Sequence, residues 1–439
     1  MKLTKQNVYK VGLLGLGTVG TGTAEILLNP AGRNPLIRDL DLHRVGVKTI
    51  GKPREVDLPT AMLTTDLEAI VTDPEVDIVV ELIGGTERAR SLILQAIAAG
   101  KHIVTANKAV IARHGAEIFS AAQEAGVYVL IEAAVGGGIP IIQPLKQSLG
   151  ANRIQKITGI INGTTNYILT QMQDVGADFA DVLAEAQHLG YAEADPTADV
   201  DGFDAADKIS ILASLAFNGR IKYDDIEREG IRTISVADID YAKKLGFTIK
   251  LLAIAQQDTH THGHLQLRVG PTLVPKDHPL ASVNGVFNAI LVEADPLGQV
   301  MFYGPGAGKG ATASAVVSDL LNITALLQGE KLEDALHPLL ACPHEDYCQI
   351  APITELETRF YARFRCGDRP GVIGHLGTCF GDQGISLASI VQIGYQGDHP
   401  EVVVVTHEVA EGKFRQAVDA IHAYETVDDI QVASILRVL

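Results

Sequence analysis

The sequence predicts an α/β protein in three parts: a Rossmann nucleotide-binding domain at 1–145, an α+β domain with an open sheet at 146–330, and a ferredoxin-like domain at 355–439. In the first part, short apolar strands alternate with amphipathic helices, which predicts a parallel sheet. The second part has the pattern of antiparallel strands. The last part has the order strand–helix–strand–strand–helix–strand, which is that of ferredoxin-like folds.

Composition and charge exclude several classes of protein. A chain of 439 residues has room for about three domains. Its net charge of −17 disfavours binding to nucleic acid or to an anionic membrane. We find no apolar run long enough to span a membrane and no signal-peptide pattern in the first ten residues. Four cysteines suit a reducing compartment, so we predict a cytoplasmic protein.

The strands of the first part are short and almost wholly apolar, as expected for strands that are buried on both faces. We expect them at 7–14, 42–48, 76–82, 102–105 and 127–132. The first helix should end near Leu28, before Asn29-Pro30, and two further helices should cover 86–99 and 109–125.

A glycine-rich turn joins the first strand to the first helix. Gly15, Gly17 and Gly20 have the spacing of dinucleotide-binding loops. The residues between them are Leu16, Thr18 and Val19. A tight turn without a ligand has the same pattern, but the position between a strand and a helix favours a pyrophosphate at the helix N-terminus.

The end of the second strand distinguishes the two nicotinamide cofactors. An acidic residue there binds the ribose hydroxyl of NAD, whereas a cation suits the 2′-phosphate of NADP. The sequence has Lys48 at this place, followed by Lys52 and Arg54. A second explanation is that these residues are simply charged side chains of a solvent-exposed loop. The sequence favours NADP and leaves NAD open.

The second part changes character after about residue 145. We expect strands at 155–161, 249–256, 264–269, 288–294 and 299–303. Helices should begin near Thr164 and cover 205–217 and 311–328, and the last of these is a candidate to pack back on the nucleotide-binding domain.

Six carboxylates lie between Glu193 and Asp207, directly before the apolar helix at 205–217. The segment partly resembles a calcium-binding EF-hand loop, but Lys208 occupies the place of the bidentate ligand, which excludes that site. A solvated face with an Asp204–Lys208 ion pair is a second explanation. Because the helix is strongly apolar, we expect it to be buried, and a buried lysine among carboxylates favours a functional role.

The segment from Ala186 to Lys208 has the sequence Ala-Gln-His-Leu-Gly-Tyr-Ala-Glu-Ala-Asp-Pro-Thr-Ala-Asp-Val-Asp-Gly-Phe-Asp-Ala-Ala-Asp-Lys. It resembles the signature of the homoserine dehydrogenase family. Further segments agree with this family at 15–20, 83–87, 105–108, 132–140 and 162–166. The resemblance covers residues 8–330 and implies that 146–330 is the catalytic and dimerisation domain.

The resemblance implies reversible hydride transfer between a nicotinamide cofactor and the pair L-homoserine and L-aspartate 4-semialdehyde, a step of threonine, methionine and isoleucine biosynthesis. By resemblance, Lys208 is the proton donor and Lys108 lies near the nicotinamide and the substrate oxygen. Two cations suit this reaction because negative charge develops on that oxygen. Glu193 and Asp204 would bind the substrate ammonium, which leaves Asp199 to orient Lys208 or to bind substrate.

The resemblance also implies a site for a monovalent cation, Na⁺ or K⁺. Four residues would form it: Glu132, Val135, Gly137 and Ile139. Backbone carbonyls beside one carboxylate suit such a hard ion. A flexible hinge at 136–138 is the alternative explanation for the glycines, and both can hold. Thr86, Gly190 and Gly308 join the cofactor-binding residues by the same resemblance, the last two at the nicotinamide end.

Two other functions compete with this interpretation. A phosphorylating semialdehyde dehydrogenase needs a cysteine nucleophile, but the first cysteine is Cys342, which excludes that reaction. A nucleotide-sensing regulator without catalysis would not need Lys108 and Lys208 together with the acidic residues.

The C-terminal part resembles the ACT domain. Its elements are expected at 358–366, 371–382, 385–393, 401–408, 412–424 and 430–437. The turn from Asp368 to Gly371 precedes a helix whose first N–H groups suit the carboxylate of an amino acid, with Pro370 near its first position, and in this family setting the ligand would be L-threonine. The alternative is a domain that only pairs subunits, through the apolar strand at 402–405. We expect a homodimer or homotetramer.

Three prolines between 331 and 357 indicate a linker, assigned to 331–354. Few contacts should cross such a boundary, so a chain without residues 355–439 is expected to fold, to remain active and to lose its response to threonine. Cys342, His344 and Cys348 lack the spacing of a zinc site, and we assign no zinc.

Overall fold

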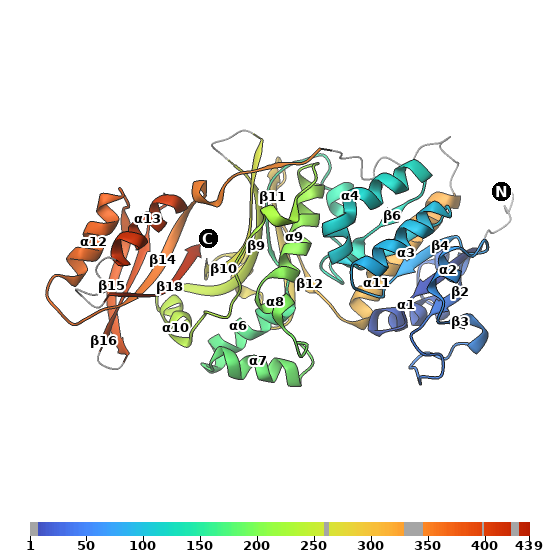
Figure 1. The fold of residues 1–439 in the computed structure, drawn as a ribbon, viewed down its shortest axis with the longest axis horizontal. Helices are drawn as coiled ribbons and strands as arrows, with labels where there is room; N and C mark the ends of the chain where they lie inside the picture. Colours follow the sequence, from blue (N-terminus) through green and yellow to red (C-terminus); the bar gives the residue numbers. More distant parts are fainter. Residues whose placement is uncertain (1–7, 259–262, 329–345, 397–398, 423–429) are drawn as a thin grey trace. The chain divides into compact units, whose positions relative to one another are not determined.

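A computed structural model describes residues 8–258, 263–328, 346–396, 399–422 and 430–439 (Figure 1). The chain divides into two compact units, each built from three segments. The first contains Met1–Ile157, Asp207–Asp224 and Asn288–Cys348, and the second contains Thr158–Ala206, Asp225–Phe287 and Gln349–Leu439. The domain boundaries expected from the sequence stay predictions, and most of the expected linker lies outside the described residues.

The first unit contains a six-stranded parallel sheet of order β3-β2-β1-β4-β5-β6. Its strands are β1 (Tyr9–Leu14), β2 (Leu40–Gly46), β3 (Leu63–Thr64), β4 (Ile78–Glu81), β5 (His102–Thr105) and β6 (Val129–Leu130). The connecting helices are α1 (Thr18–Leu28), α2 (Leu67–Val71), α3 (Glu87–Ala98) and α4 (Lys108–Ala125). This strand order is that of dinucleotide-binding Rossmann domains. The predicted fold class is confirmed, and the strand expected at 127–132 is shorter than predicted.

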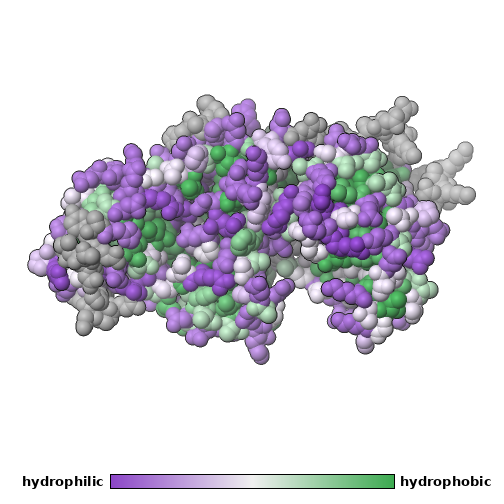
Figure 2. Space-filling model, in the orientation of Figure 1, coloured by the Kyte–Doolittle hydropathy of each residue, from purple (hydrophilic) through white to green (hydrophobic). Residues whose placement is uncertain are grey.

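Helix α11 (Lys309–Gln328) belongs to the core of the same unit. Val316, Leu320 and Ile323 share a buried apolar cluster with Val11 and Leu13 of β1. Within the described ranges, α11 is the one helix long and apolar enough to cross a membrane, a test that the core helix of a globular domain also passes. The face drawn in Figure 2 is mainly hydrophilic, with apolar residues in separate patches. Because its apolar side chains lie in the buried cluster with β1, we describe α11 as a core helix.

The first unit also contains the neighbouring strands β11 (Phe287–Asp295) and β12 (Gly298–Pro305), and most of β7 (Arg153–Ile160). The second unit centres on β9 (Phe247–Gln257) and β10 (His264–Pro275), which pair antiparallel along their length. Helices α6 (Gly163–Val175) and α10 (Val236–Lys244) pack on β9. The sequence analysis did not predict α10, although Ser235 and Asp238 form a capping box at its start.

The segment that contains residues 186–208 folds into parts of three helices. Helix α7 (Phe179–His188), which was also not predicted, and the short helix α8 (Thr197–Val200) lead to α9 (Phe203–Ala216). Helix α9 passes from the second unit to the first after Ala206. Its apolar side chains, such as Ile209 and Leu212, are fully buried, as the sequence predicted.

The C-terminal elements confirm the ferredoxin-like order. They are β14 (Glu357–Arg365), α12 (Val372–Asp382), β15 (Leu387–Gln396), β16 (His399–Thr406), α13 (Glu411–His422) and β18 (Gln431–Val438), drawn in orange and red in Figure 1. The sheet has the order β18-β14-β16-β15, and Phe360, Phe380 and Phe414 lie in its core. Gly371 is the N-cap of α12, which places Pro370 just outside the helix rather than near its first position.

Two expectations about the C-terminal part are wrong. Val402 and Val405 lie on β16, which pairs with β14 on one side and β15 on the other, so this strand has no edge for pairing subunits. The expectation that few contacts join this part to the rest also fails. Strand β18 pairs in parallel with β10, through Thr272 with Arg437 and Leu273 with Val438.

A buried ionic cluster adds to this junction. The Arg363 guanidinium on β14 donates to Asp238 on α10 at 2.9 Å and also binds Glu401 on β16. All three side chains are almost completely buried. The C-terminal sheet therefore continues the sheet of the second unit through β10 and β18, and a buried ionic cluster joins it to α10.

Candidate active site

The glycine-rich turn after β1 has the geometry that pyrophosphate binding needs. Gly15 has a φ of +102°, and a side chain at Gly20 would come within 2.1 Å of the Gly15 carbonyl. Gly17 is the N-cap of α1 and has no side-chain cap, and nothing lies within 4 Å of the place of a Cβ there. The first N–H groups of α1 are thus open to an anion, and the helix dipole favours one.

The loop after β2 contains the three cations noticed in the sequence. Lys48 is exposed, two residues beyond the end of β2. The Arg54 guanidinium donates to the carbonyls of Ile50 and Lys52, each at 2.7 Å, and also to the carbonyl of Thr49. Arg54 therefore holds this loop in shape, whereas Lys48 and Lys52 are both exposed.

A buried carboxylate organises the ends of β4 and β5. Glu81 is completely buried and accepts hydrogen bonds from the Thr105 hydroxyl at 2.6 Å and from the Ile83 N–H at 2.9 Å. Burial raises the pKa of Glu81, against these hydrogen bonds. Asn107 donates to the carbonyl of Gly85 at 2.8 Å and caps α4. Together these bonds join the loop that leads to Thr86 to the start of α4, where Lys108 is the first residue.

Lys208 lies on α9 with 9% of its surface exposed. Its neighbour Asp207 is also buried and forms an ion pair with Arg113 of α4 at 3.0 Å. The Arg113 guanidinium also lies 4.4 Å from the centre of the Tyr223 ring. The ion pair of Asp207 therefore joins α9 to α4. Asp204 lies one turn before Lys208 on the same side of α9.

One amide brings two of the predicted substrate residues together. The Asn162 side chain donates to Asp199 at 2.7 Å and to Asp204 at 2.8 Å. Asn162 is 5% exposed, and its carbonyl oxygen caps α6 by accepting from the Thr165 N–H at 2.8 Å. The carboxylates of Asp199 and Asp204 thus converge at the N-terminus of α6.

Glu193 and Gly190 lie on the loop that follows α7. Glu193 is exposed, and the Gln187 amide holds its carbonyl at 3.0 Å. Gly190 has a φ of +78°, a conformation that favours glycine. These two residues, with Asp199 and Asp204, belong to the second unit, whereas Lys108, Lys208, Gly308 and the nucleotide loop belong to the first.

The residues expected to bind a monovalent cation are buried in the first unit. Both carboxylate oxygens of Glu132 are engaged with backbone N–H groups of α5 (Ile142–Lys146) and the residue before it. The donors are Ile141 at 2.6 Å, Ile142 at 2.9 Å and Gln143 at 2.8 Å. Burial raises the pKa of Glu132, opposed by these bonds. The Glu132 carboxylate therefore caps the start of α5, and its expected use as a cation ligand stays a prediction.

The backbone of the same segment suits a cation better. Gly137 has a φ of +52°, and a Cβ there would come within 2.4 Å of the Gly306 carbonyl. This close packing argues against a flexible hinge as the reason for the glycines. Among the backbone hydrogen bonds of the described residues outside helices and strands, none ends on the carbonyl of Glu132, Val135, Gly137 or Ile139. Hard oxygen ligands of this type fit Na⁺ or K⁺.

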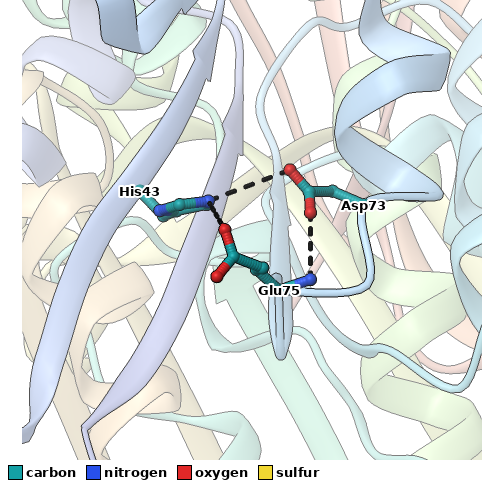
Figure 3. Close-up of side chains that lie close together, drawn as sticks. All are labelled: His43, Asp73 and Glu75. Carbon is teal, nitrogen blue, oxygen red and sulfur yellow. Dashed lines mark hydrogen bonds and ion pairs between the residues drawn. The ribbon is translucent and has the colours of Figure 1, made fainter.

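Another group of side chains with metal-ligand chemistry lies beside β2 (Figure 3). The facing atoms of His43, Asp73 and Glu75 lie within 4.8 Å of one another. Lys10 binds Glu75 at 2.8 Å, and Arg44 lies 3.8 Å from Asp73. Because cations already balance both carboxylates, we assign no metal to this group.

The comparisons with known proteins agree with this geometry. Residues 140–321 match the family model described as "Homoserine dehydrogenase", and residues 15–132 match "Homoserine dehydrogenase, NAD binding domain". Residues 360–426 match the ACT domain. The chain belongs to the homoserine dehydrogenase family.

Individual relatives extend over nearly the whole chain. A homoserine dehydrogenase of Synechocystis sp. is 64% identical over 98% of this chain and 99% of its own length. The crystal structure of a homoserine dehydrogenase from Thiobacillus denitrificans has a TM-score of 0.89 and 42% identity, over 99% of this chain and 98% of that one. A hyperthermophilic archaeal homoserine dehydrogenase in complex with NADPH has a TM-score of 0.60 and 26% identity, over 74% of this chain and 99% of that one.

For a homoserine dehydrogenase, the structure adds residues that the sequence analysis left without a role. Asn162 and Glu81 both organise site residues through side-chain bonds across 24 to 42 positions of the chain. Asn162 belongs to a segment that carried the family resemblance, and its position before Gly-Thr-Thr is typical of a helix N-cap. Glu81 is the last residue of the apolar strand β4. A carboxylate at the end of a buried strand was the feature of the sequence from which its role could have been predicted.

Proposed function

We propose that the chain interconverts L-homoserine and L-aspartate 4-semialdehyde with a nicotinamide cofactor, and that Lys208 transfers the proton. The observation that carries this proposal is the pairing of Asp199 and Asp204 on one Asn162 amide, with Lys208 one turn after Asp204. Asp204, which would bind the substrate ammonium, and Lys208, which would exchange a proton with the substrate oxygen, thus lie on one helix.

The lysines and the carboxylates have different roles in the proposed reaction. When bound, the nicotinamide supplies or takes the hydride at the carbon of the aldehyde or alcohol. In the reduction, Lys208 Nζ gives a proton to the oxygen that gains negative charge, and in the oxidation it takes the proton back. Lys108 stabilises the same charge as a second cation. Glu193 and Asp204 bind the ammonium, and Asp199, held by Asn162, orients Lys208 or binds substrate.

We propose NADP as the preferred cofactor, with NAD as a weaker one. Support comes from exposed Lys48 at the end of β2, from the absence of an acidic residue at that place, and from the similar archaeal enzyme, which was solved with NADPH. Thr86, Gly190 and Gly308 complete the proposed cofactor site. Lys48→Glu should raise the KM for NADP more than that for NAD, and equal effects would refute this assignment.

We propose that the monovalent cation, Na⁺ or K⁺, binds the carbonyls of Glu132, Val135, Gly137 and Ile139.

The further proposals concern regulation and assembly. L-threonine would bind at the turn from Asp368 to Gly371 and inhibit, supported by the ACT match and by the uncapped start of α12. We also propose a cytoplasmic homodimer or homotetramer.

The decisive experiment is oxidation of L-homoserine with NADP and with NAD, with and without L-threonine. Lys208→Ala should lower kcat by about 10²–10⁴-fold, because proton transfer is lost. Cofactor affinity, measured by fluorescence titration, should stay almost unchanged. Exposed Lys222 provides the control, and Lys222→Ala should keep normal kcat. Near wild-type turnover in Lys208→Ala would remove Lys208 from the mechanism.

A further inference from the structure

Strand β10 of the second unit carries an arginine whose surroundings do not balance its charge. Arg268 is 6% exposed, and its Nη1 atom is buried without a hydrogen-bond partner. Among the side chains that the structure describes, no carboxylate forms an ion pair with it. Burial, together with the positive charge of Arg437, lowers the pKa of Arg268 to about 9.

The acid that would balance Arg268 is already engaged. Glu411 accepts two hydrogen bonds from Arg437, at 2.9 Å and 2.8 Å, and is also bound by Arg415. Glu229, the next carboxylate, lies 3.4 Å from Arg437. A buried guanidinium without its own anion is costly, and pairing with an anion lowers that cost.

Arg268 lines a cavity of about 290 Å³. This volume is close to the lower limit, about 300 Å³, of pockets that bind small molecules. Leu267, Ile350, Ile353 and Leu356 supply an apolar part of its wall, and Gln266 supplies an amide. The cavity thus offers one buried cation beside an aliphatic surface.

Two carboxylates stand at the same cavity. Asp225 and Glu227 line it and are exposed. Glu227 pairs with Arg268 in the parallel ladder of β8 (Glu227–Arg228) and β10, so both side chains leave the sheet on the same face. These acids would repel a simple anion but would attract a ligand that carries an ammonium group as well as a carboxylate.

We propose that this cavity binds a free α-amino acid with an aliphatic side chain. Its carboxylate binds Arg268, its ammonium binds Glu227 and Asp225, and its side chain contacts Ile350, Ile353 and Leu356. The site is separate from the turn at Asp368–Gly371 and does not depend on the function proposed for that turn.

The place of the cavity gives the ligand a way to act on the protein. Its walls come from β10, from residues 225–227 at the start of β8, and from 350–356, which leads into the C-terminal sheet. Ala351 donates its N–H to the carbonyl of Leu265 on β10 at 2.8 Å. A bound amino acid would join these segments, and we expect it to stabilise the junction between β10 and the C-terminal sheet.

The test uses the full chain and measures binding apart from activity. L-valine, L-isoleucine and L-methionine are titrated by calorimetry and by thermal unfolding, beside isovalerate, which lacks the ammonium, and isobutylamine, which lacks the carboxylate. We expect at least one amino acid to raise the midpoint of unfolding by a few degrees at saturation, and neither analogue to do so. No binding by any amino acid, or equal binding by isovalerate, would overturn the proposal.

Two variants locate the site. Arg268→Met should lower the affinity by about 30-fold or more, and Glu227→Gln should lower it less, because Glu227 is exposed. Exposed Arg153 provides the matched control, and Arg153→Met should bind normally. Without ligand, Arg268→Met should unfold at the same temperature as the unsubstituted protein or higher, since it removes an unbalanced charge. A fall in both variants without ligand would show instead that Arg268 and Glu227 pair directly and that no ligand is needed.

Discussion

Arg363→Met should destabilise the protein at the junction between the C-terminal sheet and α10. The Arg363 guanidinium is 2% exposed and donates to both oxygens of Asp238, at 2.9 Å and 3.3 Å, and to the Ser235 hydroxyl at 3.0 Å. It also binds Glu401, which accepts a hydrogen bond from Tyr241 at 2.5 Å. The substitution keeps an unbranched side chain but leaves two buried carboxylates without their cation.

The size of the effect follows from the burial of this cluster. Burial by itself would lower the pKa of Arg363, but its hydrogen bond to Asp238 and the charges of Asp238 and Glu401 raise that pKa above its usual value. The native state thus stabilises the cation strongly. Breaking a buried ion pair by removing one partner typically costs about 3–5 kcal/mol, which we expect as the loss in free energy of unfolding.

The neighbouring residue Arg365 supplies a matched control on the same strand. Its side chain is 43% exposed and lies 3.9 Å from Glu401, so Arg365→Met should cost at most about 1 kcal/mol. Urea unfolding is followed by circular dichroism and by limited proteolysis, which reports opening of the C-terminal sheet. A loss for Arg363→Met no larger than that for Arg365→Met would refute the reasoning. Adding Asp238→Asn and Glu401→Gln to Arg363→Met should recover part of the loss.

Three further predictions follow from the same structure. Asn162→Ala should raise the KM for L-homoserine while leaving cofactor affinity unchanged, because Asp199 and Asp204 lose their shared donor; steady-state kinetics with an unchanged KM would contradict this. Burial lowers the pKa of Lys250 from 10.5 to about 8. The unfolded state therefore binds more protons between these values, and the stability of the unsubstituted protein relative to Lys250→Met should rise from pH 8 to pH 10, by up to about 3 kcal/mol, in urea titrations at each pH. Deletion of residues 355–439 should give an insoluble or inactive chain, because β10 loses the partner strand β18; a soluble, active product would restore the boundary expected from the sequence.

The sequence predicted the parts of the structure that depend on local pattern. Apolar runs of four to eight residues gave the strands of the first sheet, and the ferredoxin-like order was visible because its elements follow one another without interruption. Helix α10 was missed because its apolar periodicity is weak, although its capping box was readable. The junction between β18 and β10 joins residues about 165 positions apart, which no local pattern predicts.

The same distinction applies to the site. Lys208 and the acidic residues before it were found because they lie in one contiguous segment, and the structure places Asp199 and Asp204 on a common amide. That amide belongs to Asn162, about 40 positions earlier, and its dual role as helix cap and carboxylate donor depends on α6 and α9 meeting. Sequence reasoning could name the charged groups, but not the neutral side chain that positions them.

Glu132 shows that a residue predicted for a site can also have a structural role that the sequence does not reveal. The family resemblance implied that Glu132 takes part in a cation site, and a carboxylate suits a hard ion. The chain turns back directly after this segment, and three backbone N–H groups at the start of α5 reach both oxygens of Glu132. The donors would otherwise be unsatisfied in a buried helix terminus, which costs more than a lost surface ion pair. The charge of Glu132 still lies beside the carbonyls of the proposed cation site, so the carboxylate can favour a cation through its field while its oxygens serve the helix.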